Sequence, residues 1–438
     1  RNAMTQAVLE GVSFAFRDGK AALESAGVSI GEAVVLGGGA AGVAAAVAAA
    51  RKGVKVVLIE RNSFLGGKAT AAEVGTVCGL YHFSKNEEST YIVNGFAKEF
   101  ADKLQAQSQS TPLHVPEGVH YLPYNIDAFK NICAELIRIH KIKVQYNAVL
   151  KNVSLDQHTI KSVSIIANGI PITIGLNALI DCSGDSIISQ AANLPLIKSD
   201  HYQAAAQVFT MEGVSEESEF KLGMILIKAL RSAIDKELLG DFYDRVYIVQ
   251  GSLKNNCVSL KVGIPIAVTY APGNLQELRT VAQSLVVNLS QYLISNVDAF
   301  KNAHIKNIAP EVGIRVGQRS TGKYILMEED VLSCKKFENA IANGSWPIEI
   351  WEQNRRVNMR YFNLDDYYQI PADCLQSNSL NNLFFAGRNI SATDGAIASA
   401  RVMGICLQTG YAAGCLAAAT ALKLSMNDTI RQIQTEQL

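Results

Sequence analysis

The residues with the clearest chemical potential form one glycine pattern followed by a distant acid. Gly37, Gly39 and Gly42 follow the apolar residues 33–36 in a G-x-G-x-x-G arrangement. An alanine-rich segment comes next, and a second apolar run ends at Glu60. A strand, a helix and a strand in this order, with an acid about 20 residues past the glycines, indicate a dinucleotide-binding βαβ unit.

Each of these residues has a physical role in holding a pyrophosphate. Gly37 permits a tight turn, and Gly39 has no Cβ, so a phosphate can approach the backbone. Gly42 lets the helix lie close to the strand. The helix N-terminus around Ala41 offers free N–H groups and partial positive charge to the phosphates. Glu60 can accept hydrogen bonds from ribose hydroxyls, so these five residues are predicted to bind the cofactor.

The residues after the acid indicate which dinucleotide is bound. They read RNSFLGGK from Arg61 to Lys68. This segment resembles FAD-dependent oxidoreductases of the glutathione-reductase-like class, in which paired glycines let the backbone pass close to the flavin. The resemblance implies FAD as the cofactor, with Arg61, Gly66, Gly67 and Lys68 among the residues that bind it.

Two later segments extend the resemblance. Residues 178–191 read ALIDCSGDSIISQA and are similar to the strand and turn beside FAD in that class, which implies roles for Ser183 and Gly184. Residues 313–331 also fit a bacterial family known mostly as FAD-dependent oxidoreductases. Together the matching segments span roughly residues 31–422.

The C-terminal segment, residues 382–419, resembles the last flavin-binding segment of the same family. There Gly387 ends an apolar strand, and the resemblance implies that Arg388 meets the FAD pyrophosphate. A helix that begins near Val402 and Met403 is expected to face the flavin pyrimidine. Its N–H groups and dipole would stabilise the negative charge of reduced flavin.

The composition limits the remaining options. The chain has 438 residues, 48% hydrophobic and 18% charged, with a formal net charge of zero. It is long enough for two or three domains, and its neutral balance argues against nucleic acid or an anionic membrane as the main partner. The eight cysteines show no C-x-x-C or zinc-ligand spacing, so we expect buried free thiols, no metal site and a reducing cytoplasmic location. No signal peptide is recognised.

One apolar stretch, residues 402–422, is long enough to test as a membrane span. It is rich in alanine and glycine and contains Gln408, Thr409 and Tyr411. It also coincides with the place where the flavoprotein family has a buried helix. We therefore predict a helix packed inside the protein.

These patterns predict an α/β fold with a Rossmann-type FAD-binding domain, residues 31–200 and 366–438. This domain would carry a β-meander over residues 144–180, with a hairpin turn at Asn168-Gly169 and Val149 near the adenine end. Residues 201–365 would form an α+β substrate or cap domain. Residues 1–30 would form an N-terminal extension. Residues 7–40 resemble the C-terminal part of xylulokinase-like carbohydrate kinases, and we interpret this segment as a fusion or an unusual extension without kinase activity.

The second domain supplies the candidates for catalysis. Arg315 and Arg319 are four residues apart and would suit a carboxylate substrate, with structural salt bridges as the alternative. His82 is a candidate acid or base, and Cys78 is a weaker one. Asp394 stands where the family often has a histidine, and it could serve as a helix cap or a base.

The predicted function is FAD-dependent hydride transfer between flavin N5 and a small organic substrate, with an anionic substrate as one option. No second G-x-G-x-x-G follows a strand, so no separate nicotinamide domain is expected and the electron acceptor stays open. A homo-oligomer is compatible with the sequence. The alternatives are a flavin-binding protein without catalysis, an NAD-dependent dehydrogenase and, from residues 5–40 alone, a sugar kinase.

Overall fold

A computed structural model describes residues 31–199, 202–353 and 357–438. Its centre is a five-stranded parallel sheet in the order β21-β10-β1-β2-β6. Because all five strands run the same way, their carboxyl ends meet at one edge, where open α/β sheets bind ligands. The strands are β1 (Glu32–Leu36), β2 (Lys55–Ile59), β6 (Lys143–Gln145), β10 (Ala178–Asp181) and β21 (Leu383–Phe385).

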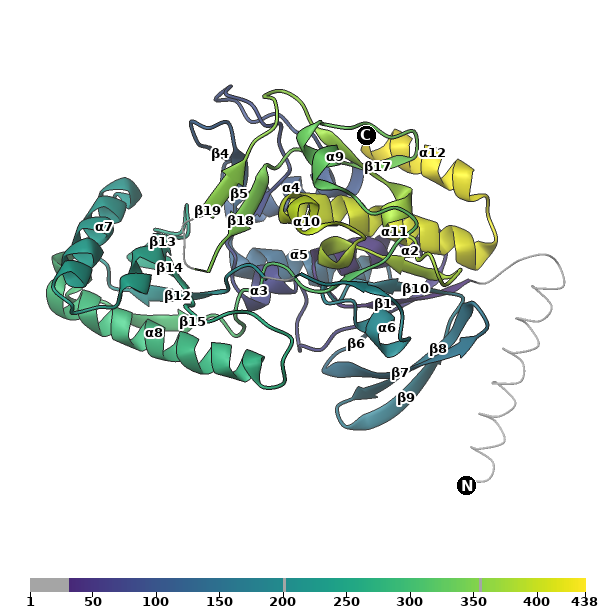
Figure 1. The fold of residues 1–438 in the computed structure, drawn as a ribbon, viewed down its shortest axis with the longest axis horizontal. Helices are drawn as coiled ribbons and strands as arrows, with labels where there is room; N and C mark the ends of the chain where they lie inside the picture. Colours follow the sequence, from purple (N-terminus) through teal and green to yellow (C-terminus); the bar gives the residue numbers. More distant parts are fainter. Residues whose placement is uncertain (1–30, 200–201, 354–356) are drawn as a thin grey trace.

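Two helices, α2 (Ala40–Arg51) and α11 (Met403–Leu422), lie side by side on one face of the sheet (Figure 1). Their backbones approach closely because α11 presents glycines to α2. A Cβ on Gly410 would lie 2.2 Å from the Ala41 carbonyl oxygen, and one on Gly414 would lie 2.3 Å from that of Ala45. Of the described residues, only α11 forms a helix long and apolar enough to cross a membrane. In the most apolar 18-residue window of α11, 89% of the residues are buried inside the protein, as predicted.

The other face of the sheet is covered by an antiparallel meander of β7 (Ala148–Asp156), β8 (Thr159–Ala167) and β9 (Ile170–Gly175). It lies below the sheet in Figure 1. Val34 and Leu36 of β1 share a core with the meander, whereas the alternate residues face the helices, as the pleat of a strand requires. Asn168 and Gly169 have φ angles of 49° and 81°, which suit the predicted two-residue hairpin turn.

A second core belongs to an antiparallel sheet in the order β13-β14-β12-β15, backed by the helices α7 and α8 at the left of Figure 1. This core extends from Ala205 to Val312. The sequence placed the end of the second domain at residue 365, but residues from Val316 to Phe362 pack into the larger core of the first domain. The elements that form the second core are β12 (Ala206–Glu212), α7 (Glu219–Asp235), β13 (Val246–Ile248), β14 (Cys257–Gly263), α8 (Asn274–Asn296) and β15 (His304–Ile308).

The remaining elements connect these layers. Asn125 caps α5 as predicted, because its side-chain oxygen accepts hydrogen bonds from the N–H groups of Asp127 and Ala128. The predicted extension, residues 1–30, lies outside the described residues. The connecting elements are α3 (Lys68–Ala71), β3 (Thr76–Cys78), α4 (Gly95–Ser108), β4 (Leu113–His114), β5 (His120–Pro123), α5 (Ile126–Ile139), α6 (Ile187–Ala191), β11 (Leu196–Ile197), β16 (Arg319–Ser320), α9 (Glu328–Leu332), β17 (Ala340–Gly344), β18 (Ile348–Trp351), β19 (Val357–Arg360), β20 (Tyr368–Pro371), α10 (Asp394–Ala400) and α12 (Met426–Gln437).

Candidate active site

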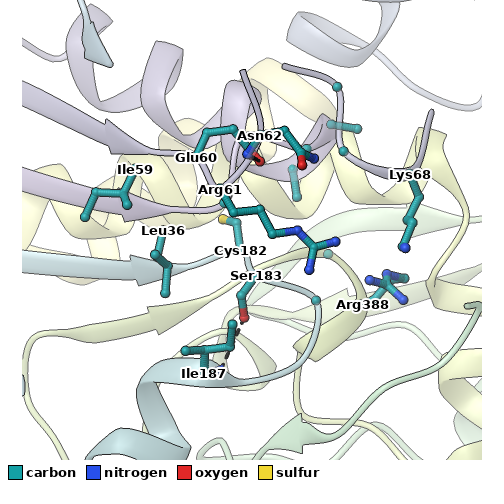
Figure 2. Close-up of a pocket in the computed structure, with 18 of the residues that line it drawn as sticks. Leu36, Ile59, Glu60, Arg61, Asn62, Lys68, Cys182, Ser183, Ile187 and Arg388 are labelled. Atoms are coloured by element: carbon teal, nitrogen blue, oxygen red, sulfur yellow. Dashed lines mark hydrogen bonds between the residues drawn. The ribbon is translucent and has the colours of Figure 1, made fainter. Parts of the chain in front are cut away.

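A pocket opens at the carboxyl edge of the parallel sheet (Figure 2). Its walls come from the residues that follow β1, β2, β10 and β21, with one side closed by the meander. Segments that are far apart in the sequence meet here because they follow parallel strands that end at the same edge of the sheet. The predicted cofactor residues that line it are Gly37, Gly39, Ala41, Glu60, Arg61, Gly66, Gly67, Lys68, Val149, Ser183, Gly184, Gly387, Arg388 and Met403.

Two predicted residues, Gly42 and Val402, lie behind the lining. A Cβ on Gly42 would come within 1.7 Å of the Gly37 carbonyl oxygen, so this glycine lets α2 start directly on the turn. Val402 is the residue before the first turn of α11, and the next residue, Met403, reaches the pocket. Both residues shape the site through the backbone.

Two glycine loops meet in the middle of the pocket. The N–H of Gly66 donates to the Gly38 carbonyl oxygen at 2.8 Å, and Gly39 forms a parallel bridge with Gly66. Gly67 has a φ of 54°, and a Cβ there would lie 2.8 Å from the Cα of Gly39. This crossing has backbone but no side chains, which fits a pyrophosphate that must approach the chain closely.

Glu60 is buried at the end of β2 and holds the first loop in place. Its Oε2 accepts a hydrogen bond from the Gly38 N–H at 2.6 Å, and its Oε1 accepts one from the Asn62 N–H at 2.8 Å. Burial raises the pKa of Glu60, while these two backbone hydrogen bonds lower it. A carboxylate has about four lone-pair positions, so room remains for ribose hydroxyls.

Cations gather on one side of the pocket, where Figure 2 shows Arg61, Lys68 and Arg388. Arg388 is fixed by a hydrogen bond from Nη1 to the Ile314 carbonyl oxygen at 2.8 Å. A Cβ on Gly184 would lie 2.4 Å from Nη2 of Arg388, so only glycine leaves space for that guanidinium. The positive side of the pocket suits the charge of a pyrophosphate.

Glu311, which the sequence analysis missed, comes from the second domain and ties this cationic side together. Its Oε2 lies 2.7 Å from both Lys68 Nζ and Arg61 Nη2. Asn62 Nδ2 donates to its Oε1 at 3.2 Å, and Lys68 also donates to the Val312 carbonyl oxygen at 2.9 Å. No local motif marks Glu311, because its partners are more than 240 residues away in the sequence.

The electrostatics of this group follow from burial and charge. Burial raises the pKa of Glu311, but Lys68 and Arg61 outweigh burial and lower it to about 2. Burial lowers the pKa of Lys68 to about 8, against the attraction of Glu311. The Glu311 carboxylate is therefore ionised near neutral pH and partly neutralises the cations of the pocket.

Further lining residues also escaped the sequence analysis. Asn62 lies two residues after the recognised acid Glu60, so its position in the sequence was a local signal. The others are apolar or small and are brought in by strand order and by the meander. The lining residues not predicted are Leu36, Ala40, Ile59, Asn62, Ala69, Ala148, Leu150, Cys182, Ile187 and Cys406.

Arg319 is not in the pocket lining. Its side chain is fully buried, and its Nε donates to the Ala392 carbonyl oxygen at 2.9 Å. It also forms an ion pair with Asp394, which is the first residue of α10. The cap of α10 is Thr393, so the structure contradicts a capping role for Asp394. These contacts match the alternative of a structural salt bridge for Arg319.

Arg315 points in a different direction. It donates a hydrogen bond to the Ala204 carbonyl oxygen, and its guanidinium carbon lies 4.3 Å from the centre of the Trp351 ring. The two arginines therefore do not converge on one ligand as the sequence analysis expected. Their four-residue spacing would place them together on a helix, but the segment is irregular around the short strand β16 (Arg319–Ser320).

His82 and Cys78 also lie outside the pocket lining. The His82 ring is edge-on to Tyr367, with ring centres 6.5 Å apart, and burial lowers its pKa. Burial raises the pKa of the Cys78 thiol far above its usual range, which disfavours a thiolate. All eight cysteines are free. In the described residues, no group of three or more His, Cys, Asp or Glu side chains could hold a metal ion.

Comparison with known proteins now decides the family. The model of the FAD dependent oxidoreductase family matches residues 32–438. The chain belongs to this family. Its cofactor is FAD, and the protein is an FAD-dependent oxidoreductase, so the alternatives of an NAD-dependent dehydrogenase and of a flavin-binding protein without catalysis are set aside. The match begins after residues 1–30 and gives no support to the kinase resemblance.

Solved structures resemble the chain at low identity. A geranylgeranyl bacteriochlorophyll reductase-like protein from Thermoplasma acidophilum is 12% identical with a TM-score of 0.46, and the match covers 93% of this chain and 83% of that one. The p-nitrophenol 4-monooxygenase PnpA from Pseudomonas putida is 12% identical with a TM-score of 0.44, over 92% and 83% of the chains. No curated protein matches significantly.

Proposed function

We propose that this flavoenzyme transfers a hydride between a small organic substrate, anionic in character, and N5 of FAD. The observation that carries the proposal is the position of the segment from Glu311 to Arg315. This segment leaves the core of the second domain and contacts Lys68 and Arg388 in the pocket wall. A substrate held by the second domain would therefore lie beside the cofactor.

When bound, FAD supplies the redox chemistry, since it can accept a hydride and pass two electrons to an acceptor. The chain supplies binding and orientation. The glycine crossing at Gly39 and Gly67 would hold the pyrophosphate, with Lys68 and Arg388 providing positive charge. The N-terminus of α11, next to Met403, would oppose the negative charge of reduced flavin.

Arg315 is the cation that favours an anionic substrate, because Lys68 and Arg388 would already face the pyrophosphate. Arg315 and Arg388 are linked, because Arg388 Nη1 also lies 3.5 Å from the Arg315 carbonyl oxygen. Arg315 thus connects the cofactor pocket to the second domain. We also propose a cytoplasmic location, since eight free thiols suit a reducing compartment.

Anaerobic flavin bleaching tests this function. The FAD-loaded protein is mixed without oxygen with small hydroxy and amino carboxylic acids and with their uncharged amides, and visible flavin absorbance is followed. We expect at least one carboxylate to bleach the flavin faster than its amide does. Reduced protein is tested in parallel with unsaturated and keto acids, where absorbance should return. Equal rates for acids and amides, or no reaction with any compound, would contradict the proposal.

A further inference from the structure

A thiol, an amine and a carboxylate meet on the sheet of the second domain, which lies at the left of Figure 1. Glu212 ends β12 and Cys257 begins β14, and these two residues are directly opposite each other in the antiparallel pair. Lys306 comes from β15, the strand on the other side of β12. Strand order therefore brings together residues that are up to 94 positions apart in the sequence.

The three side chains contact one another. Lys306 Nζ lies 3.4 Å from Cys257 Sγ and 2.7 Å from Glu212 Oε1. The Cys257 thiol donates a hydrogen bond to the same Oε1 at 3.4 Å, and His304 Nε2 lies 3.5 Å from the other carboxylate oxygen. The side chains of Lys306 and Glu212 are 49% and 39% exposed, so small solutes in water can reach the cluster.

Cys257 differs from the other cysteines in its surroundings. Within the described residues, it is the only cysteine whose sulfur accepts a hydrogen bond from an ammonium group. An adjacent cation favours the thiolate, which is the reactive form of cysteine. Burial instead raises the pKa of the other seven thiols, which are Cys78, Cys133, Cys182, Cys334, Cys374, Cys406 and Cys415.

The geometry of this cluster suits an oxidative coupling of sulfur and nitrogen. A peroxide oxidises a thiolate to sulfenic acid, which can condense with a nitrogen nucleophile to a sulfenamide. The 3.4 Å between Nζ and Sγ lies within the range of about 3–3.5 Å from which reacting atoms attack. The hydrogen bond to Glu212 raises the pKa of Lys306, so the amine is charged at rest. It must lose a proton before it attacks, and the Glu212 carboxylate is in place to accept that proton.

We propose that Cys257 and Lys306 form an oxidative covalent cross-link, at a modification site separate from the FAD pocket. One molecule of hydrogen peroxide converts the Cys257 thiol to sulfenic acid and water. The Lys306 ammonium gives one proton to Glu212, which releases it to solvent, and the nitrogen attacks the sulfur. The S–O bond breaks as the S–N bond forms, and the hydroxide leaves as water with a second proton from the nitrogen. The sulfur loses two electrons and the peroxide gains them.

The cross-link is reversible and has a mechanical consequence. Two molecules of an added thiol restore the Cys257 thiol and the Lys306 amine, and they leave as a disulfide of that thiol. While it is present, the bond joins β14 to β15 across β12 and closes a covalent loop, which restrains the unfolded chain. Since β15 leads to Glu311, whose ion pairs with Arg61 and Lys68 form the pocket wall, the bond also restrains the segment that enters this wall.

Peptide mass spectrometry tests the cross-link directly. The FAD-loaded protein is treated with hydrogen peroxide and digested without reductant. We expect a linked pair of peptides containing Cys257 and Lys306, lighter than their sum by two hydrogen atoms, and we expect dithiothreitol to remove it. A linked pair that keeps one oxygen atom, formed with a second peroxide as an S–O–N bridge, would also support the cross-link. Oxidation of Cys257 to sulfinic acid, or an unmodified Cys257, without any linked pair would overturn the proposal.

Variants of the cluster assign the roles of its members. Lys306→Arg keeps the positive charge beside Glu212 but lacks the amine, so Cys257 should be oxidised without a cross-link. Glu212→Gln should slow cross-linking at least 10-fold, because no carboxylate accepts the proton. Lys254→Arg is the matched control, since Lys254 is exposed, its backbone pairs with Cys257, and its change should leave the yield unaltered. Coupling of Cys257 to another amine in Lys306→Arg, or an unchanged rate in Glu212→Gln, would contradict the assignment.

Urea unfolding gives a second readout that needs no substrate and is independent of the bleaching test. Peroxide-treated wild-type protein should unfold at a higher urea concentration than reduced protein, and dithiothreitol should abolish the difference. Lys306→Arg should show no such increase. An equal increase in wild type and in Lys306→Arg would show that oxidation elsewhere in the chain causes it.

Discussion

At the scale of single residues, Glu60 joins the glycine turn to the cofactor pocket. Glu60→Ala should weaken FAD binding by about 1–3 kcal/mol, because both its contact with the Gly38 N–H and its capacity to hold ribose hydroxyls are lost. Titration of the apoprotein with FAD measures this. Glu60→Gln keeps acceptor oxygen and should retain more affinity than Glu60→Ala. Unchanged FAD affinity in Glu60→Ala would remove Glu60 from the ribose site.

Lys261 makes a different residue-scale prediction, about stability. Burial lowers its folded pKa to about 8, below the ordinary value of 10.5, so between these two pH values only the unfolded chain binds the proton. The contribution of Lys261 to stability should therefore rise with pH across this window. Lys261→Met should be more stable than wild type at pH 7 by about 1–3 kcal/mol. Urea unfolding at pH 7 and near pH 10.5 should show this difference shrinking; a less stable Lys261→Met at pH 7 would contradict the buried-charge argument.

At the scale of elements, the contact between α2 and α11 links packing to the cofactor. Gly410→Ala places a Cβ against the backbone of Ala41, which lines the FAD pocket. Backbone atoms cannot move aside as easily as the end of a flexible side chain can. We therefore expect the free energy of unfolding to fall by about 1–3 kcal/mol and FAD binding to weaken. Gly175→Ala is the matched control, because a Cβ there meets nothing within 4 Å. Thermal unfolding and FAD titration of both variants check the result, and equal behaviour would show that the helix contact tolerates the methyl group.

Some features of these elements could be predicted from the sequence, and others could not. The βαβ unit, the hairpin at Asn168-Gly169 and the cap at Asn125 depend on residues close in the chain, so local patterns predicted them. The contact of Lys261 with Trp351 depends on how two separate sheets pack, one containing β14 and the other β18, and no local spacing encodes it. The spacing of Arg315 and Arg319 misled for the same reason, since an irregular segment sends the two side chains apart.

At the scale of the whole molecule, Glu311 joins the two domains across the cofactor pocket. It belongs to the segment that leaves the second core, and its partners Lys68 and Arg61 follow β2 of the first. Burial raises its pKa, but the cations win and lower it to about 2, below the ordinary value of 4.5. The stability that this carboxylate contributes is therefore fully present above about pH 4.5 and is lost as the pH falls toward 2.

Glu311→Gln should remove this contribution, which amounts to about 3 kcal/mol at most from the size of the pKa shift. At pH 7 the variant should unfold at lower urea concentration than wild type, and the difference should shrink as the pH falls through the window from 4.5 to 2. Glu338→Gln serves as a control, because its carboxyl group has no ion pair in the described part of the chain. If the two proteins lose stability in parallel on acidification, the ion pairs of Glu311 do not hold the domains together. In that case the segment from Glu311 to Arg315 is fixed by its backbone contacts alone, such as the hydrogen bond from the Glu311 N–H to the Ala71 carbonyl oxygen at 2.7 Å.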